Sequence, residues 1–320
     1  MRENSIIGPF ARQHRLLLST WLTIASCFYL PPVSAEPVVV SYPSRSLTSF
    51  LIPEIARQRG FFLAEGMGGI DIKALLTGDV DYVMASGSAV SAFVAGIPVR
   101  LVLGQVSRAE HVLMAQNKYR QVKDLKGQTI GSLNPGGLVD ALLRQILSKN
   151  GLDPDRDVVL INLGGTPERY AALKSGTVAA TVLGAPHNFR AERDGFRKIA
   201  SAADYAQVPT SGLTVRSDRI VKQPQQIKKM IRGTLRAMRF MRENRGDTIA
   251  TVIRELGMDS ESATKGYEQI VSLMSEDGHV QAEGVQFLID LARQSQRINK
   301  PLTAAQMIDH SLLEEVLAGK

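Results

Sequence analysis

The chain has 320 residues, of which 44% are hydrophobic and 22% charged, a composition typical of a globular protein with about two domains. Its net charge of +7 is spread along the chain without basic patches interleaved with aromatic residues, which argues against nucleic-acid binding. The single cysteine, Cys27, lies in the N-terminal segment, so disulfides, thiolate catalysis and cysteine metal sites are excluded from the folded part.

The first 35 residues have the features of a secretory signal peptide. Arg12 and Arg15 precede an apolar run over residues 16–30, and Val-Ser-Ala at 33–35 forms a small-residue cleavage site. The apolar run is short for a membrane span. A second interpretation treats the Ile-Ala-Ser-Cys motif as a lipoprotein box, which would leave Cys27 lipid-anchored at the mature N-terminus. Both interpretations predict export to the periplasm.

After the signal, the hydrophobic pattern predicts repeated units of a strand, a small polar loop and a helix. The strands predicted in the first block are residues 36–41, 80–85 and 98–106, and the helices are 50–59, 70–76 and 89–95. A crossover is expected after residue 106.

The second block repeats this alternation and then returns to the first. Its predicted strands are 111–115, 129–131, 158–163, 178–183 and 196–200. Its predicted helices are 138–150, 166–173 (with Thr166 as N-cap and Pro167 first) and 189–194, the last after a loop at 184–188. Beyond Asp204 the pattern predicts a strand at 211–215 and helices at 227–244, 247–256, 260–273, 283–293 and 304–317. Such alternation favours parallel sheets covered by helices on both faces.

The clearest candidate binding segment is residues 129–151. A short strand leads into a turn, Asn134-Pro135-Gly136-Gly137, and then into a helix whose expected apolar face includes Leu138, Leu142 and Ile146. A helix start offers unpaired N–H groups and partial positive charge, which suit a carboxylate, sulfonate or phosphate-like group. Neither a Walker loop nor a dinucleotide fingerprint is present, and an ordinary strand-to-helix turn is the alternative.

Four segments carry a family resemblance. They are ALLTGDVDYVMASGSAVSAFVAG (74–96), KDLKGQTIGSLNPGG (123–137), GGTPERYAALKSGTVAATVLGAP (164–186) and MIDHSLLEEVLAG (307–319). In this order they resemble exported substrate-binding proteins of ABC importers, of the nitrate/sulfonate/taurine and thiamine-pyrimidine-precursor type. The resemblance covers nearly all of residues 38–319 and implies an α/β, two-lobe type II periplasmic binding protein, in which each lobe is a mixed sheet flanked by helices and two crossover hinge strands join the lobes. Lobe 1 would comprise residues 36–106 plus 205–320, and lobe 2 residues 107–204.

The same resemblance implies a function. The protein would be a monomer that captures a small anionic molecule between its lobes and delivers it to an ABC permease in the inner membrane, with no cofactor and no nucleic-acid partner. The ligand-binding residues implied by the family's motifs are Ser44, Ser46, Ser86, Gly87, Ser88, Asn134, Pro135, Gly136, Gly137, Thr166, Gly184, Ala185 and Pro186. For the serines near residue 46, capping of the following helix is the alternative role.

One segment departs from the family pattern. The family has a strand after the Gly-Phe-Phe segment, whereas here Glu65-Gly66-Met67 runs almost directly into Gly68-Gly69-Ile70, so that strand is expected to be missing. Its loss would leave the first strand as an exposed apolar edge and remove part of the cleft rim. A degenerate, non-binding paralogue therefore stays open as an alternative.

An enzyme on the same fold, acting in pyrimidine or related metabolism, is the other alternative. The histidines are scattered without metal-ligand spacing, and no Gly-x-Ser-x-Gly motif is present. Only His187 lies near the expected cleft, and packing is its more usual role. For Asp79 and Asp81, a turn cap is favoured over acid–base work. We therefore predict no catalytic residues and no metal.

Three arginines bear on the charge of the ligand. Arg45, Arg108 and Arg169 are the candidates to face the cleft, where a bidentate pair would favour an anion. The alternative for each is an exposed surface arginine.

Overall fold

The chain forms two five-stranded mixed sheets. The structure is a computed structural model that describes residues 38–42, 46–67, 70–74, 81–133 and 135–319. The first sheet has the order β2 (Ile70–Ala74), β1 (Val38–Tyr42), β3 (Tyr82–Val83), β10 (Ser211–Arg216) and β4 (Val99–Val106). The second has the order β7 (Val159–Asn162), β6 (Thr129–Ser132), β8 (Ala180–Leu183), β5 (Val112–Ala115) and β9 (Arg197–Ser201).

The two sheets are built on one plan. In the first, β1 pairs in parallel with β2 and β3, and β10 runs antiparallel between β3 and β4. In the second, β6 pairs in parallel with β7 and β8, and β5 runs antiparallel between β8 and β9. The chain therefore passes from one sheet to the other twice, through residues 107–111 and again through residues 202–210.

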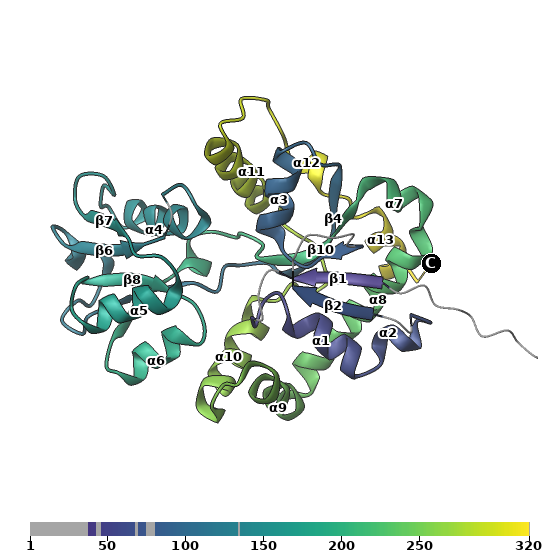
Figure 1. Ribbon diagram of the computed structural model, residues 1–320, viewed down its shortest axis with the longest axis horizontal. Helices are drawn as coiled ribbons and strands as arrows, with labels where there is room; N and C mark the ends of the chain where they lie inside the picture. The colour runs from purple at the N-terminus through teal and green to yellow at the C-terminus, as the bar shows by residue number, and fades with distance from the viewer. Residues whose placement is uncertain (1–37, 43–45, 68–69, 75–80, 134, 320) are drawn as a thin grey trace, which may run out of the picture. The chain divides into compact units, whose positions relative to one another are not determined.

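Helices cover both faces of each sheet (Figure 1). Those that pack with the first sheet or its helices are α1 (Leu51–Gln58), α2 (Phe61–Ala64), α3 (Ser86–Val94), α7 (Ser217–Lys222), α8 (Pro224–Glu243), α9 (Arg245–Leu256), α10 (Ser260–Leu273), α11 (Ala282–Gln296), α12 (Ala304–Met307) and α13 (Ser311–Leu317). The second sheet carries α4 (Leu138–Lys149), α5 (Thr166–Lys174) and α6 (His187–Arg193). Short 3-10 turns lie at Val122–Leu125 and Ala202–Asp204.

Two of the apolar cores combine residues from both sheets' helices. One joins α3, α4 and α11, with Val90, Leu143 and Leu288 among its buried members. The other fills the space around α1 and α8 and also includes Phe189 of α6. Burying apolar side chains from both halves of the chain together stabilises the arrangement that the two crossovers permit.

The expectation that the second strand is missing is wrong. Residues Ile70–Ala74, predicted as the start of a helix, form β2, which pairs in parallel with β1 from Val38↔Ile70 to Tyr42↔Ala74. The sequence Ile-Asp-Ile-Lys-Ala alternates apolar and charged residues with the period of a strand, not that of a helix. β2 therefore takes the edge of the sheet, and β1 is not exposed there.

Smaller boundary predictions also change. Residues 86–88, expected as a loop, are the first turn of α3. The N-cap of α5 is Gly165, so Thr166 and Pro167 each lie one position further into the helix than predicted. The helix expected at 304–317 is broken into α12 and α13. The buried face of α4 is centred on Leu142, Leu143 and Ile146, and Leu138 is only partly buried. The signal segment with Cys27, as well as Ser44, Arg45, Asp79 and Asn134, lies outside the described residues.

A helical glycine sets how closely α11 approaches the second crossover. A Cβ added to Gly284 would collide with the backbone carbonyl oxygen of Gln207, whereas a Cβ added to Gly246 of α9 would meet nothing within 4 Å. We expect Gly284→Ala to lower the free energy of unfolding by about 2 kcal/mol or more, because backbone must move. Gly246→Ala should raise it by up to about 1 kcal/mol. Urea denaturation measures both, and a neutral Gly284→Ala would contradict the close contact.

A histidine links α13 to the loop after α10. His279 Nε2 lies 2.7 Å from Glu314 Oε1, and its Nδ1 lies 2.9 Å from Asp277 Oδ2. The hydrogen bond to Glu314, followed by that to Asp277, raises the pKa of His279 above its usual 6.5. The resulting stabilisation is complete below the unfolded-state pKa and is lost as pH rises through the folded-state pKa.

We therefore expect a pH-dependent effect of His279→Gln. The wild type should exceed the variant in melting temperature by more at about pH 5.5 than at about pH 8, as measured by thermal denaturation. An equal difference at both values would show that protonation of His279 contributes nothing to stability.

Candidate functional site

The N-termini of two helices open onto one cavity of about 210 Å³. The first turn of α3, which packs on the first sheet, contributes Gly87. The start of α4, which packs on the second sheet, contributes Gly136 and Gly137. Residues 288–295 of α11 form a mostly apolar wall. The complete lining is Gly87, Ser91, Gly136, Gly137, Leu138, Leu288, Leu291, Ala292 and Ser295.

The two helix starts give the cavity its polar character. The first N–H groups of a helix have no intrahelical acceptor, and the helix dipole adds partial positive charge there. The Gly87 amide, in the first turn of α3, donates to no acceptor among the described residues, and α4 begins at Leu138, directly after Gly137. Both helices are longer than two turns, so both dipoles are developed. The cavity therefore combines unpaired N–H donors with apolar walls.

Asp140 fixes the turn that carries Gly136. Its side chain is 4% exposed and accepts hydrogen bonds from the Gly136 amide (3.0 Å) and the Ser132 hydroxyl (2.9 Å). It also accepts from Arg144 Nε (2.9 Å), one turn further along α4. A single carboxylate thus ties the end of β6, the turn and the helix together, so the position of the cavity's second helix start depends on it.

We expect Asp140→Ala to destabilise the protein by about 2–4 kcal/mol, because it leaves buried donors and part of a charge pair without their acceptor. Asp155→Ala is the matched control, since Asp155 also pairs with Arg144 (2.7 Å) but its side chain is 73% exposed. That control should cost less than about 1 kcal/mol. Chemical denaturation of both variants measures the difference, and equal losses would show that the Asp140 contacts carry no special weight.

Arg169 is a buried cation at the end of β8. Its side chain is 1% exposed and donates to three neutral oxygens: Val182 O at 2.9 Å, Gly164 O at 2.6 Å and Thr166 Oγ1 at 3.2 Å. Burial lowers the pKa of Arg169, because the charged form loses its water. It forms no ion pair with any described carboxylate. Of the three candidate arginines, Arg169 is therefore neither surface-exposed nor a free ligand-facing group.

The cavity brings together only some of the predicted ligand residues. Gly87, Gly136 and Gly137 line it, whereas Pro135 is exposed beside it. Ser86 is fully buried and its hydroxyl has no partner among the described residues. The Ser88 hydroxyl points back to Ala85 O (3.4 Å).

The remaining predicted residues lie elsewhere. Ser46 accepts from the amide of Ser49 (3.2 Å) in the turn before α1, whereas the N-cap of α1 is Phe50, so Ser46 does not cap that helix. Thr166 is engaged by Arg169, and Gly184, Ala185 and Pro186 are half-buried between β8 and α6, with a cis peptide bond before Pro186. The predicted set as a whole stays a prediction, with Ser44 and Asn134 outside the described residues.

The residues weighed for catalysis have structural surroundings. The His187 ring packs edge-on against Tyr170, and burial lowers its pKa. Asp81 accepts from the amide of Val39 (2.8 Å) and pairs with Arg219. Across the described ranges, no group of three or more His, Cys, Asp or Glu side chains could hold a metal ion. In the same ranges, no helix combines the length and apolar character needed to cross a membrane.

The α11 wall and Asp140 were missed by sequence reasoning. Leu288, Leu291 and Ala292 belong to an amphipathic pattern that predicts a core-facing helix and nothing more. Asp140 follows the Gly-Gly turn by three residues. At this spacing an acidic side chain in the first helical turn can accept from the backbone of the turn before it, so the sequence did contain a signal for this contact.

This fold recurs in solved structures. The sulfonate-binding protein SsuA of Escherichia coli superposes with a TM-score of 0.72 at 18% identity, covering 88% of this chain and all of that one. The desulfurization enzyme DSZB gives a TM-score of 0.62 at 16% identity, covering 88% and 99%. The predicted two-lobe periplasmic-binding-protein fold is therefore confirmed. The model of the NMT1-like family matches residues 58–254, and the chain belongs to that family.

The curated relatives are longer proteins, and this chain matches only part of each. The bicarbonate transport ATP-binding protein CmpC of Synechocystis is 23% identical over 232 residues, 66% of this chain and 34% of that protein. The nitrate/nitrite binding protein NrtA of Nostoc is 27% identical over 119 residues, 37% of this chain and 27% of that protein. The chain thus spans about a third or less of the curated relatives it matches. These relatives agree with the resemblance to the nitrate and sulfonate group.

Proposed function

We propose that this protein is an exported solute-binding protein that captures a small organic anion between two lobes and delivers it to an ABC importer of the inner membrane. The lobes comprise residues 36–106 plus 205–320 and residues 107–204. The protein acts as a periplasmic monomer, without a cofactor and without catalysis. Two relatives support this class of function. One is named as a nitrate/nitrite binding protein and the other as a bicarbonate transport ATP-binding protein.

The observation that carries the proposal is the meeting of two helix starts, one from each sheet, at one cavity. An anion placed there accepts from the Gly87 amide and from N–H groups in the first turn of α4, and two helix dipoles favour its charge. Because the donors come from both halves of the chain, binding favours the conformation in which the two helix starts are close. A ligand that stabilises one conformation shifts the population toward it, and a permease can recognise that conformation.

The apolar wall narrows the ligand class. Leu138, Leu288 and Leu291 offer the cavity no polar group, so the site suits an anionic head with a short apolar tail better than a bare inorganic ion. Buried Arg169, whose hydrogen bonds all go to neutral oxygens, adds to the preference for an anion in this half of the molecule.

An enzyme is the second candidate, and the likeness to DSZB favours considering it, because that enzyme shares the fold. The contacts of Asp81 and His187 support structural roles for both, which leaves the enzyme candidate without an acid–base pair at the cavity. The degenerate-paralogue candidate rested on a missing strand, and β2 removes that basis.

We expect short alkanesulfonates and carboxylates to raise the melting temperature of the wild-type chain, in a dye-based thermal-shift panel that also includes nitrate, bicarbonate, aromatic carboxylates and pyrimidine precursors. A ligand at a hundred times its Kd adds about 2.7 kcal/mol, a shift of several degrees. A response to nitrate or bicarbonate alone would contradict the role of the apolar wall.

The matched variants are Gly87→Ala and Gly87→Leu. A Cβ at this position meets nothing within 4 Å, so Gly87→Ala should fold as well as the wild type, and the ligand-free melting temperature of Gly87→Leu shows whether that variant does. The leucine side chain would occupy the cavity and abolish the ligand shift, whereas alanine should retain most of it. If Gly87→Leu keeps the full shift, the ligand binds elsewhere and this cavity is not the site.

A further inference from the structure

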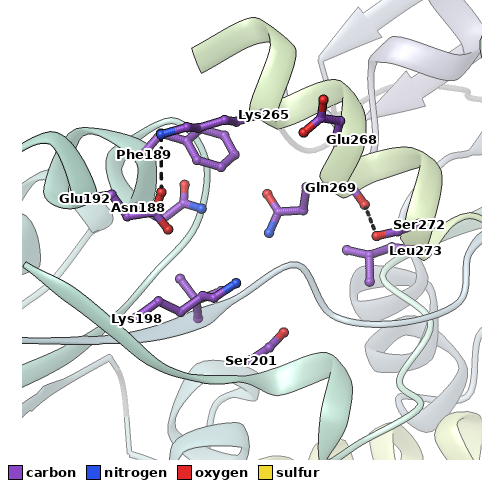
Figure 2. Close-up of a pocket in the computed structure, with 11 residues that line it drawn as sticks. Asn188, Phe189, Glu192, Lys198, Ser201, Lys265, Glu268, Gln269, Ser272 and Leu273 are labelled. Carbon is purple, nitrogen blue, oxygen red and sulfur yellow. Dashed lines mark hydrogen bonds and ion pairs between the residues drawn. The ribbon is translucent and has the colours of Figure 1, made fainter. Parts of the chain in front are cut away.

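A second and larger cavity, of about 400 Å³, lies between α6 and the ends of β5 and β9 on one side and α10 on the other (Figure 2). None of the predicted ligand residues lines it. Asn188, Lys198 and Gln269 point toward one another across the space (Figure 2). Phe189, Val112 and Leu273 add apolar surface. The cavity is therefore separate from the candidate site at the α3 and α4 helix starts.

Two residues that line this cavity each have an amide oxygen without a described hydrogen-bond donor. Asn188 is 2% exposed, and its Oδ1 has no partner among the described residues. Gln269 donates from Nε2 to Glu110 O at 2.8 Å, but its Oε1 is also buried without a described partner. Buried acceptors without donors cost free energy, and such groups commonly mark a place that a ligand or water satisfies.

The charges around the cavity leave one cation unpaired. Lys265 pairs with Glu192 at 3.6 Å and with Glu261 at 3.0 Å, and Glu268 pairs with Arg245 at 3.2 Å. Lys198 forms no ion pair with a described residue, and its amine points into the space between Gln269 and Ser201 (Figure 2). The residues of the lining therefore include one ammonium without an ion pair and two amide oxygens without a donor in the described ranges.

We propose that this cavity binds an α-amino acid with an aliphatic side chain. The carboxylate pairs with Lys198 and accepts from the hydroxyl of Ser201, which supplies the charge-assisted contact. The ammonium donates to Asn188 Oδ1 and Gln269 Oε1, which satisfies both acceptors with one group. The side chain lies against Phe189 and Leu273. A simple anion would leave the two oxygens without donors, and a simple cation would face Lys198.

The position of the cavity gives this ligand a role beyond binding. Its walls come from elements of both sheets, so an amino acid held there connects α6 to α10. It would thereby favour the same mutual placement of the two halves in which Phe189 is buried beside Leu47 and Met258.

The test is calorimetric titration of the full chain with L-leucine, L-valine and L-alanine. Two matched probes are 4-methylpentanoate, which is leucine without its ammonium, and isoamylamine, which is leucine without its carboxylate. We expect leucine to bind, and each probe to bind at least about tenfold more weakly, since each loses a charge-assisted contact. Absence of binding by all three amino acids, or equal binding of 4-methylpentanoate and leucine, overturns the proposal.

Variants assign the binding to this cavity. Lys198→Met removes the free ammonium and should weaken leucine binding at least about tenfold, while Lys123→Met, at an exposed lysine remote from the cavity lining, should leave it unchanged. Asn188→Leu should also lose binding while keeping a melting temperature at or above that of the wild type, because it removes a buried acceptor without a donor. Gly87→Leu blocks the other cavity and should not alter the leucine Kd. Wild-type affinity in Lys198→Met, or loss of leucine binding in Gly87→Leu, overturns the assignment.

Discussion

The structure depends on one topological constraint, which is that the chain passes twice between two sheets. β10 lies between β3 and β4 because the chain returns to the first sheet after completing the second. β5 lies between β8 and β9 because the chain leaves the first sheet after β4. Neither sheet is complete without a strand supplied across a connection. The close approach of Gly284 to Gln207 O packs α11 onto the second of these connections. Two helix starts far apart in sequence thereby come to share a cavity.

Among the described residues, the second sheet and its helices bury one cationic and one anionic side chain, and the two have different surroundings. Arg169 is buried beside the end of β8 and donates hydrogen bonds only to neutral oxygens, and the charge of Glu168 offsets only part of its desolvation. Asp140, in contrast, is buried with both a backbone donor and Arg144. The anionic group therefore serves the architecture of the turn, while the cationic group and the helix starts leave positive potential at the strand ends.

Sequence reasoning predicted the elements whose periodicity was long and uninterrupted. α10 was predicted with the bounds that the structure gives, and α1 and α4 were predicted to within a residue or two. β2 was missed because Gly68 and Gly69 were taken as a helix start and outweighed the two-residue alternation that follows. A five-residue strand holds few periods, so its signal is weak until a partner such as β1 is known.

The candidate site was harder to predict than the fold, since a cavity is formed by contacts between distant segments. Glycines at helix starts can be recognised locally, and Gly87 and Gly136 were. The wall from α11 cannot be recognised in this way, because nothing in residues 282–296 indicates which helix starts they will face.

The two cavities also differ in the contacts that surround them. The first rests on a buried carboxylate and an apolar core, whereas the second is bordered by Lys265 and Glu192, whose partly exposed ion pair is screened by salt. α6 also packs against α10 through Phe189 in the apolar core around α1 and α8, so a ligand bound between the two helices strengthens a contact that already exists.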